Sequence, residues 1–179
     1  MAKKNIFNFV LFQLSWIVCV LSGAAGVNWP AVLMTVIFVL VHFRFYNWRI
    51  SDARLIAAGL LVGLILDTAY SAAGLMAYNA QSWPPVAPWW ILCLWVNFML
   101  TLNHSLSWLL ERYWLAALFA GIGSPLSYFA GHKLGALTWQ QPEMLVLAAA
   151  VSWAIVIPFL LALASHWRKQ EQALNHALA

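Results

Sequence analysis

Long apolar segments alternate with short polar or turn-forming segments along the whole chain. A membrane-spanning helix needs about 20 mostly apolar residues, and most of the apolar segments approach that length. The interruptions are short and carry Gly, Pro, Asn and charged residues, which favour turns. We therefore predict an all-α integral membrane protein, a single compact bundle of about six transmembrane helices. The predicted spans are residues 6–21, 30–45, 55–78, 88–110, 113–131 and 143–165.

Composition and charge support this class and suggest an orientation. Hydrophobic residues make up 64% of the chain and charged residues 8%, which excludes a soluble domain. Most basic residues fall on the predicted side of the two termini: Lys3, Lys4, Arg44, Arg49, Arg54, Arg112, Arg168 and Lys169. Because cytoplasmic loops are rich in Lys and Arg, we predict that both termini are cytoplasmic, with Lys133 on the other side. The basic tail after Trp167 should extend the last helix into the headgroup region. The net charge of +4 fits anionic lipid, and we predict no nucleic-acid partner.

The first apolar segment allows a second interpretation. Lys3 and Lys4 precede an apolar run that ends in the small residues 22–25, as in a signal peptide with its cleavage site. The run is longer than a usual signal-peptide core and contains Gln13 and Ser15, which favours a retained helix. Both interpretations stay open at this point, because the second span enters from the outer side in either case.

Asp67 lies in the middle of the third apolar segment. A carboxylate at the centre of a spanning helix costs about 2.5–3.5 kcal/mol, so it must face protein groups or a wet cavity. One helix face carries Gly59, Gly63, Asp67, Tyr70 or Ser71, Gly74 and Tyr78. Small residues on a face let another helix approach closely. Asp67 is therefore expected either to be satisfied structurally or to be the centre of a site.

The fourth apolar segment ends in the polar run 101–108. Helical spacing places Asn97, Thr101, His104 and Trp108 on one face and Asn103 and Ser107 on another. Two polar faces predict a central helix surrounded by protein. A rise of about 1.5 Å per residue puts Asp67 between the depths of Asn97 and His104, which predicts a contact with this face. An Asp–His pair there would hold a proton, bind a cation, orient a catalytic base, or only fix the helix register.

The fifth apolar segment joins the candidate cavity. Gly121, Ser124 and Tyr128 share a face, and Pro125 lies among them. Proline within a helix removes a backbone hydrogen bond and favours a kink. Freed carbonyls at membrane depth are tolerated where protein or water satisfies them, often beside binding sites.

Tryptophan and cysteine are read from their predicted depth. Nine of the twelve tryptophans fall at predicted membrane boundaries, where indole rings anchor helices. Trp16, Trp95 and Trp153 lie deeper and are expected either to tie helices together or to line a pocket for an apolar ligand. Cys19 and Cys93 read as small hydrophobic residues, with a disulfide as the alternative.

Several catalytic patterns are missing from the chain. It contains no His-x-x-x-His cluster of the membrane desaturase kind, no Gly-x-Ser-x-Gly and no Walker motif. The histidines are scattered, and His104 alone has polar neighbours at depth, whereas His42 is expected to be interfacial or packed. We predict no metal site and no cofactor.

The runs at residues 88–109 and 123–135, together with the Leu-Asp67 element before them, resemble the bacterial membrane family catalogued as domain of unknown function 2878 (DUF2878). The resemblance covers most of the chain and implies a multi-pass protein of the bacterial inner membrane, linked to fatty-acid or membrane-lipid modification. It implies no activity. It marks as motif positions Asp67, Asn103, His104 and Pro125.

Three functions are compatible with these patterns. The first is a binding or scaffold bundle for a lipid, a small apolar ligand or a partner membrane protein. The second is an intramembrane lipid-modifying enzyme that uses His104 as general base and Asp67 to orient it or to act on water. The third is a small carrier in which Asp67 couples transport to a proton. The candidate site residues are Asp67, Tyr70, Asn97, Thr101, Asn103, His104, Gly121, Ser124 and Tyr128.

Overall fold

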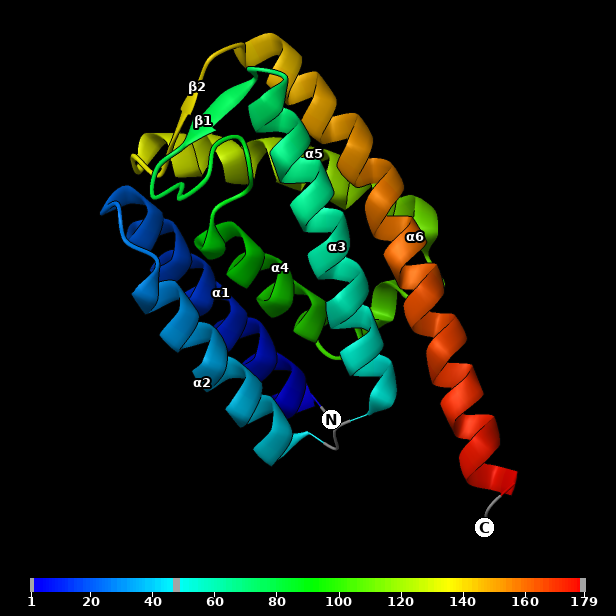
Figure 1. The fold of residues 1–179 in the computed structure, drawn as a ribbon. Helices are drawn as coiled ribbons and strands as arrows, with labels where there is room; N and C mark the ends of the chain where they lie inside the picture. Colours follow the sequence, from blue (N-terminus) through cyan, green and yellow to red (C-terminus); the bar gives the residue numbers. More distant parts are fainter. Residues whose placement is uncertain (1, 47–48, 178–179) are drawn as a thin grey trace.

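Helices form nearly all of the protein. A computed structural model describes residues 2–46 and 49–177. The elements in chain order are α1 (Ala2–Ala24), α2 (Trp29–Phe45), α3 (Ile50–Ala72), β1 (Met76–Tyr78), α4 (Trp89–Leu102), a 3-10 turn η1 (Ser107–Leu109), α5 (Tyr113–Lys133), β2 (Leu137–Trp139) and α6 (Pro142–Ala177) (Figure 1). Four helices, α1, α3, α5 and α6, are long and apolar enough to cross a membrane, while α2 and α4 are shorter apolar helices. The predicted class, a helical membrane protein, is confirmed.

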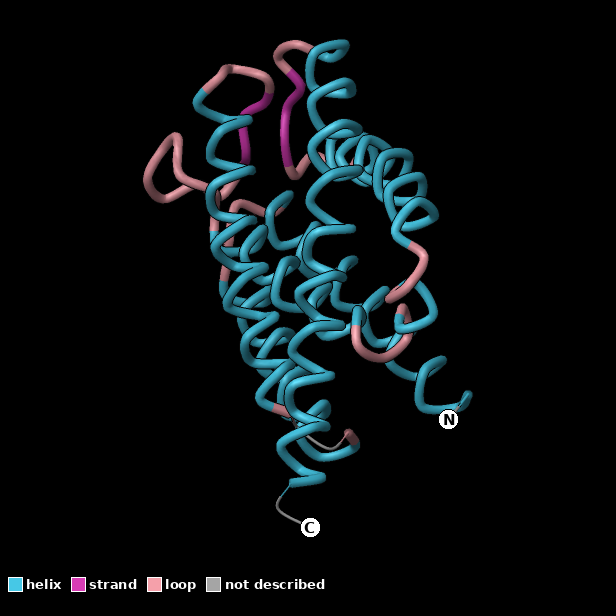
Figure 2. Tube along the Cα trace, turned by 90° about the vertical axis from the view of Figure 1, so that its right-hand side faces the viewer, coloured by secondary structure: helices cyan, strands magenta, loops and turns pink. Residues whose placement is uncertain are grey.

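The helices are arranged around α4. This helix packs against α1, α2 and α3, while α6 packs against α3 and α5. Helix α5 runs across the other helices, whereas α1, α2, α3 and α6 follow the length of the bundle (Figure 1). The two short strands lie at the end of the bundle away from both termini (Figures 1 and 2).

Helix α4 is the central element that the sequence predicted, although its second expected polar face, Asn103 and Ser107, lies beyond its end. Its 14 residues rise about 21 Å, which is less than the ~30 Å of a bilayer core. Most of its side chains are buried, including Trp90, Trp95 and Leu100. A helix this short is tolerated at membrane depth because protein, not lipid, surrounds its ends.

The third helix differs from its predicted range of 55–78. It begins at Ile50 and ends at Ala72, and Gly74 adopts a left-handed backbone with φ of 65°. Glycine reaches this conformation without the steric cost of a Cβ, so it often ends helices. The chain then turns back as β1, in which Met76 pairs with Trp139 and Tyr78 with Leu137 of the antiparallel strand β2. This small ribbon was not predicted.

The fourth helix also ends earlier than its predicted limit at residue 110. Its last residue is Leu102, and the backbone N–H groups of His104 and Leu106 both donate to the Thr101 carbonyl in a turn. The expected helical faces are therefore wrong beyond residue 102: Asn103, His104 and Ser107 do not continue the faces of α4. The polar residues compete for backbone hydrogen bonds and favour turns, which explains the early end.

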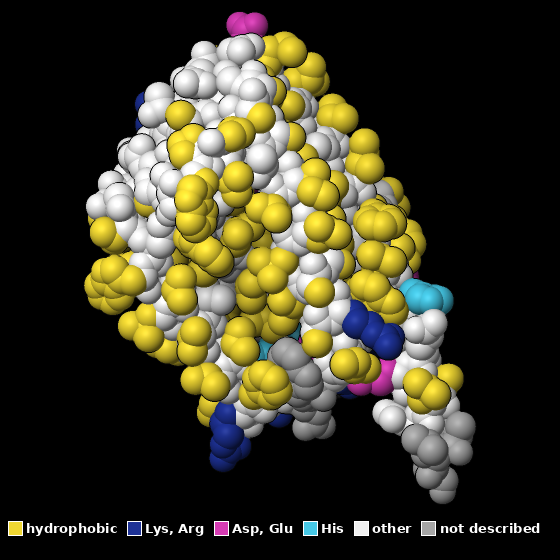
Figure 3. Space-filling view, in the orientation of Figure 1, with side chains coloured by type: hydrophobic (Ala, Val, Ile, Leu, Met, Phe, Trp, Pro, Cys, Tyr) yellow, Lys and Arg dark blue, Asp and Glu magenta, His cyan; other side chains and the backbone are white. Residues whose placement is uncertain are grey.

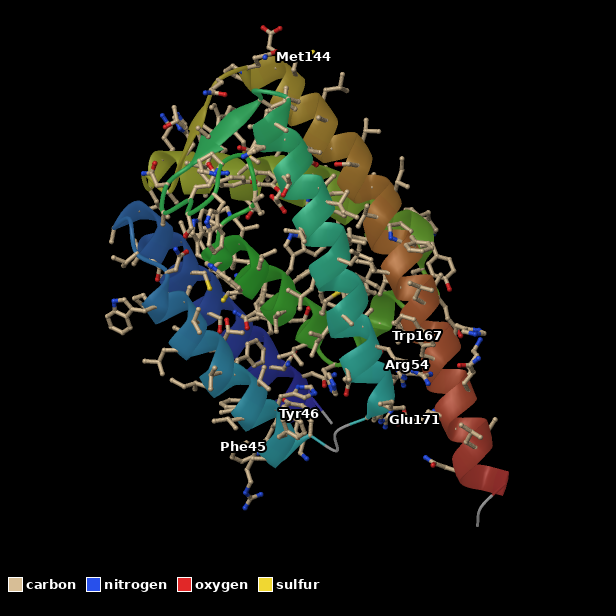
Figure 4. All side chains as sticks on the ribbon, viewed as in Figure 1. Phe45, Tyr46, Arg54, Met144, Trp167 and Glu171 are labelled. Carbon is tan, nitrogen blue, oxygen red and sulfur yellow. The ribbon has the colours of Figure 1, made fainter. Side chains whose placement is uncertain are left out.

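Both termini lie at one end of the bundle (Figure 1). Lys and Arg side chains gather at this end, below a surface dominated by hydrophobic side chains (Figure 3). Helix α6 continues through residue 177, which confirms the predicted extension of the last helix. On this extension Glu171 accepts hydrogen bonds from the Ile50 backbone N–H at 3.1 Å and the Ser51 hydroxyl at 2.7 Å, so it holds the start of α3 (Figure 4). The cytoplasmic location of this end stays a prediction.

Candidate functional site

Asp67 is fully buried and accepts hydrogen bonds from three neutral side chains. The Tyr78 and Tyr128 hydroxyls donate to Oδ1 at 2.5 and 2.6 Å, and the Trp95 indole N–H donates to Oδ2 at 2.7 Å. Helix α4, strand β1 and helix α5 each supply one donor. We call these four residues the Asp67 cluster. Burial raises the pKa of the Tyr78 phenol well above its usual range, and the nearby Asp67 raises it further, so Tyr78 keeps the proton that it donates.

The small-residue face of α3 allows Trp95 to reach Asp67. A Cβ on Gly63, one turn before Asp67, would collide with the Trp95 ring, and one on Gly59 would collide with the side chain of Met99. Both partners belong to α4. The spacing of Gly59, Gly63 and Asp67 thus lets α4 lie against the face of α3 that carries the acid, as the sequence indicated.

Tyr70 lies beside this cluster without bonding to Asp67. Its hydroxyl shares a hydrogen bond with the Ser152 hydroxyl of α6, and its ring meets the Tyr128 ring edge-on at 5.8 Å between centroids. Tyr70 therefore links α3 to α6 and supports the position of Tyr128.

A cavity of about 670 Å³ reaches the Asp67 cluster. Side chains of α1, α4 and α5 form most of its wall, with Trp153 and Ile157 from α6. Among the apolar wall residues are Phe12, Trp16, Val20, Leu94, Phe98, Leu102, Phe119 and Ala120. Its polar groups include those of Gln13, Asp67, Ser124, Ser127 and Tyr128.

The deep tryptophans join helices and also line this cavity, while its occupation by an apolar ligand stays a prediction. The Trp16 indole N–H donates to the Ser127 hydroxyl at 3.1 Å, which joins α1 to α5 across the cavity. The Trp95 ring stacks on Trp153, with centroids 4.7 Å apart. All three line the cavity.

His104 does not contact Asp67, so the predicted pair is wrong. His104 follows the end of α4, and its Nε2 lies 3.7 Å from Oδ1 of Asp52, a residue in the first turn of α3. Nε2 of His42, on α2, lies 3.5 Å from Oδ2 of the same carboxylate. Asn103 donates to Asp52 Oδ1 at 2.8 Å. We call His42, Asp52, Asn103 and His104 the Asp52 cluster.

The other candidate residues lie outside both clusters. Asn97 donates to the Thr35 hydroxyl at 3.0 Å, and the Thr101 hydroxyl donates to the backbone carbonyl of Phe98. A Cβ on Gly121 would lie 3.3 Å from the backbone oxygen of Ala150, which places α5 close to α6. Ser124 strengthens the same contact by donating to the Ala149 carbonyl at 3.1 Å. The contacts of Asn97, Gly121 and Ser124 join helices, whereas the Thr101 bond lies within α4, and Ser124 also faces the cavity. Both cysteines are free and buried, in agreement with their reading as small hydrophobic residues.

Sequence reasoning missed Asp52 and assigned Tyr78 to the wrong element. Asp52 stands between Arg49 and Arg54 at a predicted boundary, where an acid looks like an ordinary solvated residue. Its distance of ten positions from His42, across a short turn, was a signal that the two side chains could face each other. For Tyr78 the signal was Gly74, which commonly ends a helix.

The fold and these two buried clusters define the class: a small helical membrane protein with an apolar cavity that ends at a buried carboxylate. The sequence model of the family described as "Protein of unknown function (DUF2878)" matches residues 5–159, and the chain belongs to that family. A search of curated proteins and a search of solved structures each give no match.

Proposed function

We propose that the protein binds a membrane lipid or a similar apolar molecule in the cavity beside Asp67. The volume of the cavity carries this proposal. Ligand pockets measure about 300–1,000 Å³ and combine a mostly apolar wall with a few polar groups, and this cavity of about 670 Å³ has both properties. The helices of the protein expose many large hydrophobic side chains, as lipid-facing helices do. On this proposal the protein acts in the bacterial inner membrane, in the handling or modification of lipids.

A second hollow suggests which lipids are preferred. It measures about 490 Å³ and shares Trp108 with the wall of the apolar cavity. Arg112, Arg168 and Lys169 contribute to its lining, and Glu111 is the acid there. This hollow lies at the end of the bundle that we predict to be cytoplasmic, where the inner leaflet carries anionic lipid. An anionic lipid with its acyl chain in the apolar cavity and its headgroup in the basic hollow would occupy both spaces.

The enzyme alternative predicted from the sequence requires His104 and Asp67 to lie together, and they do not. His104 lies beside Asp52, while Asp67 accepts hydrogen bonds from Tyr78, Tyr128 and Trp95, so Asp67 does not orient His104 as a base. The carrier alternative needs Asp67 to exchange a proton, and the cavity does reach this carboxylate. It remains a prediction that Asp67→Asn would test.

Native mass spectrometry of the protein released from lipid particles tests the proposal. The decisive variant is Gly123→Phe, because Gly123 lines the cavity and a Cβ there meets no atom within 4 Å. The added ring fills the cavity without a clash at its first carbon. We expect the wild type to carry a defined lipid. The lipid occupancy of Gly123→Phe should be at least tenfold lower, which corresponds to a loss of ~1.4 kcal/mol in binding free energy.

Ile122→Phe is the matched control, because Ile122 is the neighbouring residue, is 56% exposed and does not line the cavity. It should keep the lipid. Replacing Arg168 and Lys169 by Gln should shift the bound lipids from anionic to zwitterionic species without emptying the cavity. Equal lipid occupancy in the wild type, Gly123→Phe and Ile122→Phe would contradict the proposal.

A further inference from the structure

The second buried carboxylate, Asp52, meets two imidazoles at the end of the bundle that carries the termini. Helix α2 supplies His42 in its last turn, α3 supplies Asp52 in its first turn, and the turn after α4 supplies His104. The side chains of His42 and Asp52 are 0% and 3% exposed, and that of His104 is 15% exposed. Three separate elements thus converge on one point that is almost closed to solvent.

The distances in this group are long for hydrogen bonds. The two imidazole nitrogens lie 3.5 and 3.7 Å from the carboxylate oxygens, whereas good N–H···O bonds measure about 2.7–3.2 Å. In a tetrahedral site with bonds of about 2.0–2.2 Å, neighbouring ligand atoms lie about 3.3–3.6 Å apart. One ligand atom from each of His42, Asp52 and His104 lies within 4.8 Å of the others. Each imidazole nitrogen thus lies at about this tetrahedral spacing from one oxygen of the carboxylate, and the three side chains are close enough together to share one ion.

The surroundings hold these side chains as metal ligands are usually held. Asn103 donates to Asp52 at 2.8 Å, and such outer hydrogen bonds fix ligating carboxylates. The Tyr46 ring stacks on His42 with centroids 5.0 Å apart and meets His104 edge-on at 4.8 Å. In residues 2–46 and 49–177, the basic groups within ion-pair distance of Asp52 are these two histidines, while Arg168 interacts with it from farther away.

We propose that His42, Asp52 and His104 bind a divalent transition-metal ion at this end of the bundle. Two imidazoles and one carboxylate are the donor set of many zinc and non-haem iron sites that keep an open coordination position. Exposure is greatest at His104, which therefore marks the side from which an ion enters. The proposal departs from the absence of a metal site predicted from the sequence, and it is independent of lipid binding in the cavity.

Titration with Co²⁺ tests the site, because the visible spectrum of Co²⁺ reports its ligands and geometry. The metal content of the purified protein is first measured by mass spectrometry as isolated. The protein is then treated with a chelator, checked for monodispersity and helicity, and titrated with Co²⁺. We expect one ion per chain with the spectrum of a low-coordinate nitrogen and oxygen site. His104→Gln, at the most exposed ligand, should weaken Co²⁺ binding at least about tenfold, and Asn103→Ser about tenfold through the outer hydrogen bond.

His166→Gln is the matched control, because His166 is exposed on α6 and its ring contacts Gln170. It should bind Co²⁺ like the wild type. A folded wild type that binds no Co²⁺, or a His104→Gln protein that binds it unchanged, would overturn the proposal and leave the three side chains as a structural link between α2, α3 and α4.

Discussion

Asp67 and Asp52 are two buried carboxylates of one helix, and their neighbours differ in kind. Fifteen residues, about 22 Å of helix, separate them. Asp67 is surrounded by neutral donors with fixed protons, two phenols and one indole. Asp52 faces two imidazoles, whose ring nitrogens are also common metal ligands.

This difference fits a junction in the fold at Asp67 and the proposed metal binding at Asp52. Three hydrogen bonds occupy Asp67 and connect α3, α4, α5 and β1, so the residue acts as a fixed junction at the end of the cavity. The contacts of Asp52 with its imidazoles are longer, and one of those imidazoles is partly exposed. The role of a buried acid in a membrane protein is thus best inferred from its partners, which are either fixed hydrogen-bond donors or groups that can also bind an ion.

The largest expected effect comes from removing each carboxylate in turn. Asp67→Ala leaves three buried donors without their acceptor, and at about 1–3 kcal/mol per unsatisfied group the loss of stability should be at least about 3 kcal/mol. Asp52→Ala should cost less, about 1–2 kcal/mol, because Asn103 donates to Asp52 at 2.8 Å while the imidazole contacts of 3.5 and 3.7 Å are long. Unfolding of both variants in detergent measures the difference. Equal losses would break the comparison.

Overpacking of the Asp67 cluster should have the next largest effect. Gly63→Ala drives a methyl group into the Trp95 ring and away from its bond to Asp67, with an expected cost of about 1–3 kcal/mol. Gly123→Ala is the control, since its Cβ meets nothing within 4 Å and alanine favours the helix. Thermal unfolding and tryptophan fluorescence report the change. A Gly63→Ala protein as stable as Gly123→Ala would show that Trp95 is free to move.

A smaller effect is expected where α6 holds the first turn of α3. Glu171→Gln keeps the shape of the side chain but weakens the hydrogen bonds from Ile50 and Ser51, and loss of a helix cap costs about 0.5–2 kcal/mol. Hydrogen exchange at residues 50–53 should increase while exchange near Asp67 stays the same. Asn175→Ala, an exposed change farther along α6, serves as the control. Unchanged exchange at residues 50–53 would mean that Asp52 is positioned without α6.

The smallest effect is expected at Tyr46, which packs against the Asp52 cluster. The Tyr46 hydroxyl donates to the backbone carbonyl of Lys4, and its ring stacks on His42. Tyr46→Phe removes the hydrogen bond and keeps the ring, so we expect a loss of about 0.5–1.5 kcal/mol with unchanged Co²⁺ affinity. Tyr46→Ala, which also removes the stacking ring, should lower that affinity. Equal Co²⁺ binding by both variants would show that the ring does not position His42.

Sequence patterns predicted the helical membrane class, the central place of α4 and the close approach of another helix at Asp67. They did so because hydrophobic length and small-residue spacing are local properties. The partners of each acid depend on where helices end. The prediction that α3 continues to residue 78 placed Tyr78 on a helix instead of on the returning strand. The prediction that α4 continues to residue 110 placed His104 close to Asp67. The turn at Leu102 takes His104 to α2 and Asp52 instead.

The donors of Asp67 have a consequence for how the protein is made. Tyr78, Trp95 and Tyr128 all follow Asp67 in the chain, and synthesis delivers the N-terminal segments first. Tyr128 follows Asp67 by 61 residues, so α3 enters the bilayer before α5 brings this donor, and the cost of the buried acid falls as each later segment packs against it. Tyr128 comes last, with α5. Completion of this junction thus requires α3, α4 and α5 to be in place, and a nascent chain that stops before α5 leaves Asp67 without the Tyr128 hydrogen bond.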